Sequence, residues 1–394
     1  MKCICCNNNN FEYLWTNLEK ESLRHKWQPL DVHICRDCGM VSLDITELTE
    51  SQLDEYYTTS NTFELPTALP EGHKDMRCNQ VGWVLNSLPK NHNVNSVLDV
   101  GCGAGYALKL FKDKGFDVMG IDWSPAMIRN LRNRYNIDGI QGSFTAEEIG
   151  VKVDLITSIA VLEHLYDPSN TLDEMKKSLN SNGFLFIEVP DAEFPLDDVI
   201  VDHLAFDHLW HWTENTLGRL MENAGFEVIA VKHLKYGPNS GNPESVVRIL
   251  AQLKSNKLNR KYTASDYAKS RENLTAYRIS HKSYLKEFQS RIDIIASKIK
   301  GEPVAIFCGG EHTATLFKRF NLVDLNIKYI FDNDPAVVGK SLNGIECREG
   351  KEAPVPEIKH YLMSTTNHEK TIHDTLKKSD PDCNVYGLYQ DWDN

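Results

Sequence analysis

Four cysteines near the start of the chain form two C-x2-C pairs, Cys3 with Cys6 and Cys35 with Cys38. Each pair can form a tight turn that directs both sulfurs toward one ion, and two such turns supply the four thiolates of a tetrahedral zinc site. A site with four protein ligands has no open position for water, so its expected role is to stabilise a small subdomain. Cys5 is an alternative to Cys6 as a ligand, and free reduced thiols are the alternative to a metal site.

Three histidines, His203, His208 and His211, lie in the aromatic stretch HLAFDHLWHW. Metal ligand, general base and core residue are the three roles open to them. Spacings of five and three residues do not bring all three rings to one face of a helix, which argues against a metal site. We expect His211 and the tryptophans on either side of it to pack in the core. His208 is the candidate general base, because an imidazole titrates near neutral pH.

The stretch LDVGCGAGY joins an apolar strand to a helix through Gly101, Gly103 and Gly105. Glycines at such a turn let the backbone bend sharply and approach a ligand closely. Asp122 ends the next strand, a position from which a carboxylate can bind both hydroxyls of an adenosine ribose. The G-x-G-x-G spacing, with Asp99 before it, differs from the G-x-G-x-x-G that binds a dinucleotide, so NAD is the less favoured ligand.

Strand and helix patterns alternate around this turn, which predicts a parallel sheet covered by helices on both faces. Apolar residues at helical spacing predict a long helix from Ser265 to Lys300, with Gly301 placed to end it. After it, PVAIFCGGEHTATLFKRF and IKYIFDNDP repeat the order strand, glycine turn, helix, strand. The predicted fold is therefore α/β, with four parts. These are a zinc-binding module at residues 1–75, a Rossmann-like core at 76–255, a linker with the long helix at 256–300, and a smaller Rossmann-like domain at 301–394.

Composition narrows the class of protein and the kind of partner. The chain of 394 residues is 41% hydrophobic and has a formal net charge of −12. It has no long basic run, so no nucleic-acid partner is expected. No stretch approaches the about 18 consecutive apolar residues of a membrane span, and the first ten residues lack the apolar core of a signal peptide. A cytoplasmic location is expected, in which ten cysteines fit metal binding better than disulfides.

Four successive motifs resemble those of class I S-adenosylmethionine-dependent methyltransferases. They are VLDVGCGAGY, GIDWSP, VDLITSIAVLEHL and NGFLFIEVP, in that order and at that spacing. The resemblance covers roughly residues 95–230, and it implies an S-adenosylmethionine cofactor. Asp99 and the glycine turn would hold its methionine part, Asp122 its ribose and the GSF stretch its adenine. Ser143 stands where that family often has an acidic residue. The implied cofactor-binding residues are Asp99, Gly101, Gly103, Gly105, Asp122, Trp123, Ser143 and Phe144.

The order of the parts also resembles the zinc-containing sugar C-methyltransferases, which act on nucleotide-linked deoxysugars. Shared short motifs are EYYTTS, IEVP and DHLWHWT. That family commonly has Tyr-His-Glu-His where this chain has Ala205, Phe206, Asp207 and His208, so only the last histidine is retained. The catalytic residues that the resemblance implies are His208, Asp207, Glu188 and Tyr57.

These features favour methyl transfer to a carbon of a small, nucleotide-linked sugar, with His208 as the general base. Asp207 or Glu188 would fix the tautomer of His208. If the acceptor is a carbon beside a ketone, the base forms an enolate, and if it is a hydroxyl, the base removes its proton as the bond forms. The alternatives are O- or N-methylation of another small metabolite or glycan, and a zinc-containing binding protein with an inactive methyltransferase domain.

The C-terminal domain has only part of a nucleotide-binding pattern. FCGGEHT keeps a turn at Gly309 and Gly310, and Asp332 closes the next strand, but the spaced glycines of a dinucleotide motif are missing. The resemblance implies a domain that closes over the nucleotide or sugar end of the substrate, with Glu311 and His312 as contacts. The alternative is a turn that only caps the following helix.

Overall fold

In the computed structural model, the chain forms two compact units. The structure describes residues 1–16, 31–59, 71–200, 203–204, 208–236, 244–254, 264–334, 337–365 and 368–392. Unit 1 comprises Met1–Leu65, Leu69–Leu196 and His203–Tyr277, and unit 2 comprises Pro66–Ala68, Asp197–Asp202 and Arg278–Asn394. The long helix α8 (Ala264–Ile299) contributes its first part to unit 1 and the rest to unit 2.

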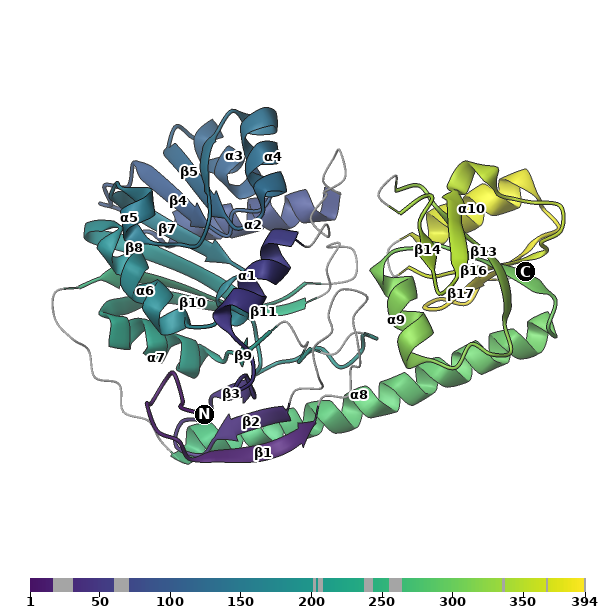
Figure 1. Cartoon of the computed structure of the whole chain (residues 1–394), viewed down its shortest axis with the longest axis horizontal. Coiled ribbons are helices and arrows are strands. Elements are labelled where there is room, and N and C mark those ends of the chain that lie inside the picture. Colours follow the sequence, from purple (N-terminus) through teal and green to yellow (C-terminus); the bar gives the residue numbers. More distant parts are fainter. Residues whose placement is uncertain are drawn as a thin grey trace. The chain divides into compact units, whose positions relative to one another are not determined.

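The main sheet of unit 1 has seven strands in the order β10-β11-β8-β7-β4-β5-β6 (Figure 1). The strands are β4 (Ser96–Val100), β5 (Asp117–Asp122), β6 (Asp138–Gln141), β7 (Val153–Ile159), β8 (Leu179–Pro190), β10 (Phe226–Tyr236) and β11 (Glu244–Leu253). The first five of these are parallel, and β10 and β11 add an antiparallel edge next to β8. Because parallel strands end at the same edge, the loops after β4, β5 and β7 share one side of the sheet.

Helices cover both faces of this sheet, as the alternating pattern predicts. They are α2 (Glu71–Ser87), α3 (Tyr106–Asp113), α4 (Pro125–Tyr135), α5 (Ala146–Ile149), α6 (Pro168–Lys177) and α7 (Glu214–Ala224), with a 3-10 turn η2 at Leu162–His164. Neighbouring strand residues pack on opposite faces. Val97 and Leu155 pack with α2, α3 and α4, whereas Leu98 and Ile156 pack with α6 and α7. The period-2 alternation of a strand thus builds two hydrophobic layers from one sheet.

The N-terminal segment forms a second, smaller sheet within unit 1. Its order is β1-β2-β3-β9, with β1 (Phe11–Thr16), β2 (Asp31–Cys35), β3 (Val41–Leu43) and β9 (Trp210–His211). The helix α1 (Glu50–Thr59) follows β3. The pairing of β3 with β9 places Val41 opposite His211 and Ser42 opposite Trp210. The cysteine-bearing segment is therefore bonded directly to the histidine-rich stretch, a connection between residues that are far apart in the sequence.

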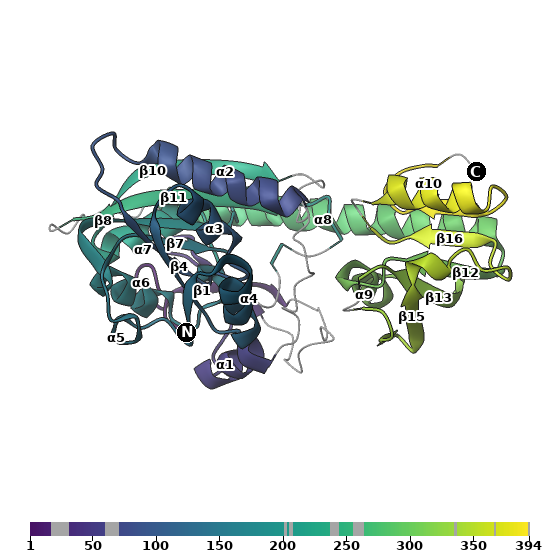
Figure 2. The ribbon, with the colours of Figure 1, turned by 90° about the horizontal axis from the view of Figure 1, so that it is seen from above.

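Unit 2 is a second α/β layer structure (Figure 2). Its sheet order is β14-β15-β13-β12-β16-β17, with all neighbours parallel except β14 and β15. The strands are β12 (Pro303–Phe307), β13 (Asn326–Asp332), β14 (Ser341–Leu342), β15 (Ile345–Glu349), β16 (His360–Met363) and β17 (Asn384–Gly387). One face packs against α8 and α9 (Glu311–Arg319), and the other against α10 (Glu369–Ser379); a 3-10 turn, η4, spans Gly350–Glu352.

The long connecting helix predicted from Ser265 to Lys300 is confirmed within one residue at each end. It ends because Lys300 and Gly301 have positive φ angles of 55° and 76°, which a helix cannot continue. Among the described helices, none combines the length and the apolar composition that crossing a lipid bilayer requires.

Candidate cofactor site and histidine cluster

The glycine turn after β4 leaves one glycine facing open space. Gly101, Gly103 and Gly105 all have positive φ, at 69°, 51° and 83°, which suits residues without a Cβ. A Cβ on Gly101 would overlap Val161, and one on Gly105 would overlap Leu131. A Cβ on Gly103 would meet no atom within 4 Å. The outer glycines therefore permit close packing, and the middle one presents bare backbone to the side where a ligand would lie.

Asp122 at the end of β5 joins this turn to the next loop. Its Oδ2 accepts a hydrogen bond of 2.9 Å from the Gly103 N–H, and its Oδ1 accepts one of 2.8 Å from the Ser124 N–H. Burial raises the pKa of this carboxyl group. Each carboxylate oxygen has a second lone pair, so the group can still accept hydrogen bonds from two ribose hydroxyls. The structure therefore fits the role that the sequence assigns to Asp122.

Asp99 lies under the turn as a buried anion, only 3% exposed. Its Oδ1 accepts a hydrogen bond of 2.6 Å from Thr157 Oγ1 on the neighbouring strand β7. Burial raises the pKa of Asp99 to about 6, although the hydrogen bond from Thr157 acts in the opposite direction. A buried carboxylate with one hydrogen bond is a favourable partner for a ligand ammonium group.

The loop predicted to contact adenine lies beside Asp122. The Gly142 N–H donates to the Asp122 backbone oxygen at 3.1 Å, so this loop is held to the end of β5. Ser143 is exposed, and Phe144 is half-buried. Trp123, directly after Asp122, stacks on Tyr57 of α1 with ring centroids 5.2 Å apart. The N-terminal segment thus contributes an aromatic ring next to the cofactor side of the sheet.

His208 belongs to a cluster that the sequence interpretation did not contain. Glu163 and His164 from η2 approach it, and the side-chain ligand atoms of these three residues all lie within 4.8 Å of one another. The rings of His164 and His208 are 4.8 Å apart, and those of His164 and Tyr57 are 5.9 Å apart. Glu163 is 1% exposed. Tyr57 therefore bridges the histidine pair and Trp123, so that the base candidate and the cofactor turn face a common region.

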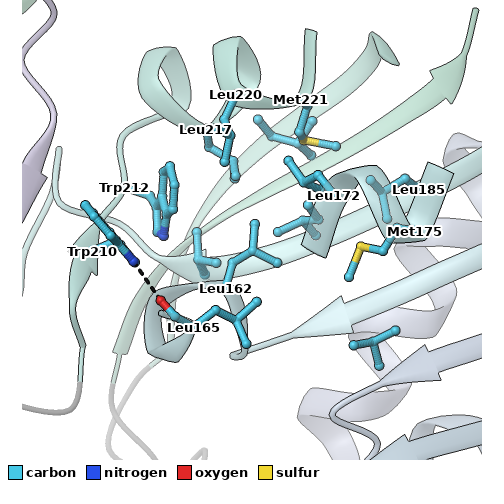
Figure 3. Packing of buried hydrophobic residues seen from close by; sticks show 14 of the residues in the cluster. Leu162, Leu165, Leu172, Met175, Leu185, Trp210, Trp212, Leu217, Leu220 and Met221 are labelled. Atoms are coloured by element: carbon cyan, nitrogen blue, oxygen red, sulfur yellow. Dashed lines mark hydrogen bonds between the residues drawn. The ribbon is translucent and has the colours of Figure 1, made fainter. Parts of the chain in front are cut away.

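The stretch around His208 is held by backbone and tryptophan contacts. The Leu209 N–H donates to the Glu163 backbone oxygen at 2.7 Å, and Trp210 Nε1 donates to the Leu165 backbone oxygen at 2.8 Å (Figure 3). Trp210 and Trp212 are 3% and 0% exposed and pack against α6 and α7. The two tryptophans are core residues, as expected, and they hold the short strand β9, which contains His211 and lies next to His208.

The two carboxylates predicted to assist His208 are Asp207 and Glu188. Asp207 falls outside the described residues. Glu188, expected beside His208, forms an ion pair with Arg248 and accepts a hydrogen bond from Gln80. A carboxylate next to His208 is present, but it comes from Glu163.

His203 and His211 do not join the cluster of Glu163, His164 and His208. The His203 N–H donates to the Tyr277 hydroxyl at 2.8 Å. His211 is 2% exposed, and burial lowers its pKa far below the usual value. Among the described residues, no group hydrogen bonds to its Nε2. His211 is therefore a neutral core histidine, although its ring lies 6.4 Å from that of His208.

The four predicted zinc ligands come together. Cys3, Cys6, Cys35 and Cys38 have all their sulfurs within 4.8 Å of one another, with 3.5 Å between the sulfurs of Cys3 and Cys38 and between those of Cys6 and Cys35. Four sulfurs about 2.3 Å from a zinc ion would be separated by about 3.8 Å, so the donor set and spacing fit zinc. Cys5 is outside this group of four sulfurs, and its Sγ donates to the Thr216 backbone oxygen at 3.5 Å, so Cys6 and not Cys5 completes the cluster.

Side chains of unit 2 hold His312, which follows the glycine turn. His312 Nδ1 lies 2.8 Å from Ser364 Oγ, and its Nε2 lies 2.5 Å from the Tyr389 hydroxyl. Burial lowers the pKa of His312 to about 4. Glu311 is the first residue of α9. Since both ring nitrogens of His312 have internal partners, the structure favours the interpretation in which this turn serves the fold.

Sequence reasoning missed Glu163, His164 and Thr157. A signal for the first two was available, because LEHL follows a buried strand after two intervening residues and therefore lies at the carboxyl edge of the sheet, where ligands bind. Thr157 has no such signal, since an apolar strand with one threonine does not reveal which neighbour the hydroxyl will meet.

The central part of the chain is similar to known methyltransferases. Residues 74–231 match the family described as "Methyltransferase domain". A probable S-adenosylmethionine-dependent methyltransferase of Mycolicibacterium smegmatis is 29% identical over 136 residues, which is 34% of this chain and 52% of that protein. A malonyl-[acyl-carrier protein] O-methyltransferase of Acetivibrio thermocellus is 35% identical over 94 residues, covering 23% and 33%.

These matches extend over only part of each protein. The chain spans about half the length of the first of these relatives. Among solved structures, magnesium protoporphyrin IX methyltransferase from Synechocystis with bound SAH is 14% identical, with a TM-score of 0.40, over 52% of this chain and 99% of that one. The match to the methyltransferase family covers unit 1 from α2 to β10, which includes the glycine turn, Asp122 and the histidine cluster.

Proposed function

We propose that this chain, whose residues 74–231 form a class I S-adenosylmethionine-dependent methyltransferase domain, methylates a carbon of a small, nucleotide-linked sugar with His208 as the general base. The observation that carries this proposal is the approach of two groups of side chains. The cofactor side of the sheet ends in Trp123, and the histidine pair reaches the same tryptophan through Tyr57. Cofactor-binding and acid–base groups thus meet in one region of unit 1.

The glycine turn and the two aspartates beside it would each bind a different part of the cofactor. Asp122 is placed to bind the ribose hydroxyls, and Gly103 offers backbone without a side chain in the way. Asp99 is placed as the partner of the methionine ammonium group. When bound, S-adenosylmethionine supplies a methyl group on a positively charged sulfur that is already a good leaving group. The protein must then align the acceptor and manage its proton.

His208 is the residue best placed for the proton. Its imidazole would take a proton from the carbon beside a ketone, or from a hydroxyl, as the new bond to the methyl group forms. The buried Glu163 next to it favours the charged imidazolium that this transfer produces, because an opposite charge at close range stabilises the protonated form. Glu163 thus takes the supporting part that the sequence suggested for Asp207 or Glu188.

A second candidate is methylation of an oxygen or nitrogen in another small metabolite or glycan. It is supported by Ala205 and Phe206, which replace the Tyr-His pair common in sugar C-methyltransferases. It is also supported by relatives whose names specify O-methylation, such as the ubiquinone biosynthesis O-methyltransferase of Saccharophagus degradans, 28% identical over 163 residues. Both candidates use the same cofactor residues and His208.

Binding and product analysis test the proposal together. Titration calorimetry with S-adenosylmethionine and S-adenosylhomocysteine should give a dissociation constant well below millimolar. Incubation with methyl-labelled cofactor and a set of keto and hydroxy nucleotide sugars should transfer label, and NMR of the product identifies the methylated atom. Absence of cofactor binding at millimolar concentration would remove both enzymatic candidates and leave the zinc-containing binding protein with an inactive methyltransferase domain.

The four cysteines are proposed to hold one structural zinc ion per chain. The zinc would stabilise the β1-β2-β3 segment. Because β3 pairs with β9, it would also stabilise the strand next to His208. Elemental analysis of protein purified without chelator should give close to one zinc per chain. Cys35→Ser should lower both the zinc content and the melting temperature, whereas Cys5→Ser should leave the zinc content unchanged. Equal zinc loss in the two variants would contradict this ligand set.

A further inference from the structure

A buried polar network runs from the sheet of unit 1 to one face of α2. Arg248, 0% exposed on β11, forms an ion pair with Glu188 on β8 and donates at 2.8 Å to Asn79 Oδ1 on α2. Gln80 Nε2 also donates to Glu188. The charges of Glu188 and Arg248 compensate each other, so this part of the network is neutral and its members hold one another in place.

The free end of the network is Arg77, one helical turn before Gln80. Arg77 Nη1 donates to Gln80 Oε1 at 2.9 Å. Because the Gln80 amide nitrogen is committed to Glu188, its oxygen must face Arg77, so the guanidinium is positioned by a fixed amide. None of the described carboxylates forms an ion pair with Arg77. Arg77 is thus a half-buried cation held in place by a neutral partner.

The direction of α2 places Arg77 toward the ligand-binding edge of the sheet. The Trp83 ring lies 5.7 Å from Phe186, and Gln80 contacts Glu188, two residues further along the same strand. The helix therefore runs opposite to β8, and Arg77 extends one more turn of about 5 Å past Glu188. That direction leads to the carboxyl edge, where the glycine turn lies.

Asp99 faces the same side of the sheet as α2. The register pairs Asp99 with Thr157 and Thr157 with Phe186, and residues paired in this way point to the same face. The Phe186 ring is the one that packs against Trp83 of α2. Burial raises the pKa of Asp99 to about 6, and the positive charge of Arg77 acts against that rise, in agreement with their proximity.

The site therefore offers a buried anion and a positioned cation to one ligand. An amino-acid moiety carries the opposite pair, an ammonium and a carboxylate. A planar guanidinium suits a carboxylate because it donates two parallel hydrogen bonds. Asp99 alone would bind the ammonium and leave the carboxylate without a partner in a partly buried site, which costs binding free energy.

We propose that Arg77 binds the α-carboxylate of the cofactor's methionine moiety, held in place by Gln80 and the Glu188–Arg248 pair. This rests on the proposed function, since it assumes that S-adenosylmethionine is the ligand at the glycine turn. Arg77 makes the site select ligands with an intact amino-acid end. A nucleoside that lacks this end keeps its contacts with Asp122 and gains nothing from Arg77.

Two ligands and three variants test the assignment. Titration calorimetry compares S-adenosylhomocysteine with 5′-methylthioadenosine, which has the adenine, ribose and sulfur but no amino-acid group. The variants are Arg77→Gln, Arg77→Lys and, as the control for losing one positive charge, Arg129→Gln on the exposed side of α4. Thermal melting shows that each variant is folded before its ligand binding is measured.

Arg77→Gln should raise the dissociation constant of S-adenosylhomocysteine about tenfold to a hundredfold and change that of 5′-methylthioadenosine by less than about threefold. Arg77→Lys should fall between the wild type and Arg77→Gln, because it keeps the charge but loses the paired hydrogen bonds. Arg129→Gln should match the wild type for both ligands.

Two outcomes overturn the inference while leaving the proposed function intact. In one, Arg77→Gln binds S-adenosylhomocysteine as the wild type does; in the other, it weakens both ligands equally, as a structural defect would. Failure of the wild type to bind either ligand is a different result, which removes the proposed function and the inference with it.

Discussion

The two Rossmann-like sheets of this protein contain the same hydrogen-bonded clasp at the end of corresponding strands. In unit 1, Asp122 accepts from the Gly103 N–H at 2.9 Å and from the Ser124 N–H at 2.8 Å. In unit 2, Asp332 accepts from the Gly309 N–H at 2.6 Å and from the Asp334 N–H at 2.9 Å. A carboxylate that ends the second strand and binds the turn after the first is thus common to both units.

The surroundings of the two clasps differ. In unit 1 a Cβ on Gly103 would meet no atom within 4 Å. In unit 2 a Cβ on Gly309 would meet Cys347 Sγ and Ile330 at 2.9 Å, whereas one on the next residue, Gly310, would meet no atom within 4 Å. The buried acid Asp99 precedes the first turn by two residues. The matching position in unit 2 is the core residue Ile306, because the Gly101 N–H and the Cys308 N–H make equivalent bonds to the second strand.

The different surroundings of the two turns distinguish a purely structural turn from a ligand-binding one. The carboxylate–glycine clasp secures the turn in both units, so its presence alone does not indicate a cofactor. A site also needs open space over the backbone and charges placed for the ligand. Unit 1 combines these features at Gly103 and Asp99. In unit 2 the backbone at Gly310 is also open, but the position that matches Asp99 is the apolar Ile306, and both ring nitrogens of His312 have internal partners.

The largest effect on turnover is expected from a comparison of two histidines, His208 of unit 1, with a proposed chemical role, and His312 of unit 2, with a structural role. His208→Asn should lower turnover by roughly 10² to 10⁴ and leave the affinity for S-adenosylhomocysteine near the wild-type value, because only the basic nitrogen is lost. His312→Asn should lower the melting temperature, because it breaks hydrogen bonds to Ser364 and Tyr389, and should change turnover less than about threefold. Steady-state kinetics and thermal melting of both variants give the comparison.

A second variant controls for packing around His208. His211→Asn alters the neighbouring buried histidine and should reduce stability more than turnover. If His208→Asn and His211→Asn lose activity in proportion to their loss of stability, the role of His208 as a base is wrong and the cluster is part of the core.

A smaller effect on binding is expected at the two clasp carboxylates. Asp122→Ala should weaken S-adenosylhomocysteine binding about a hundredfold, which corresponds to about 2 to 3 kcal/mol for lost charge-assisted hydrogen bonds to the ribose. Asp332→Ala removes the equivalent clasp in unit 2 and should destabilise that unit with little change in the same dissociation constant. Calorimetry on the two variants decides the matter, and equal affinities would mean that the cofactor turn has been assigned to the wrong place.

The smallest effect is a pH dependence that belongs to unit 1 alone. The pKa of Asp99 is raised to about 6, so the carboxyl group is mostly protonated at pH 5 and ionised at pH 7.5. Only the ionised form pairs with the methionine ammonium group, so the S-adenosylhomocysteine dissociation constant should be about tenfold higher at pH 5 than at pH 7.5. Asp99→Asn should bind weakly at both pH values. A wild-type affinity that stays constant over this range would contradict the role of Asp99.

The same shift has a consequence for stability in the absence of ligand. A carboxyl group whose pKa is higher in the folded state than in the unfolded state binds protons more tightly when folded. Asp99 therefore stabilises the fold at low pH relative to high pH, and this contribution is lost as the pH rises from about 4 to about 6. The cofactor ammonium group would offset that loss, which is consistent with a ligand site.

Local sequence was sufficient to predict features that depend on a few adjacent residues. The alternating strands and helices, the limits of the helix Ala264–Ile299 and the glycine turn all follow from periodicity and from residues that tolerate positive φ. The two C-x2-C pairs predicted a four-sulfur cluster, which the structure forms with Cys6. In each case the information lies within one turn or one element of the chain.

Contacts between distant elements were decided by tertiary structure. The sequence indicated that His208 lies near the sheet edge, but not that Glu163 and His164 would approach it, nor that Glu188 would pair with Arg248. A strand specifies which side chains share a face, whereas their partners depend on which strand or helix packs beside it. The joining of β3 to β9 is of the same kind, since residues about 170 positions apart become neighbours only when the sheet forms. Residue types and spacing therefore determined the chemistry available to this protein, and packing of distant elements determined which groups meet to perform it.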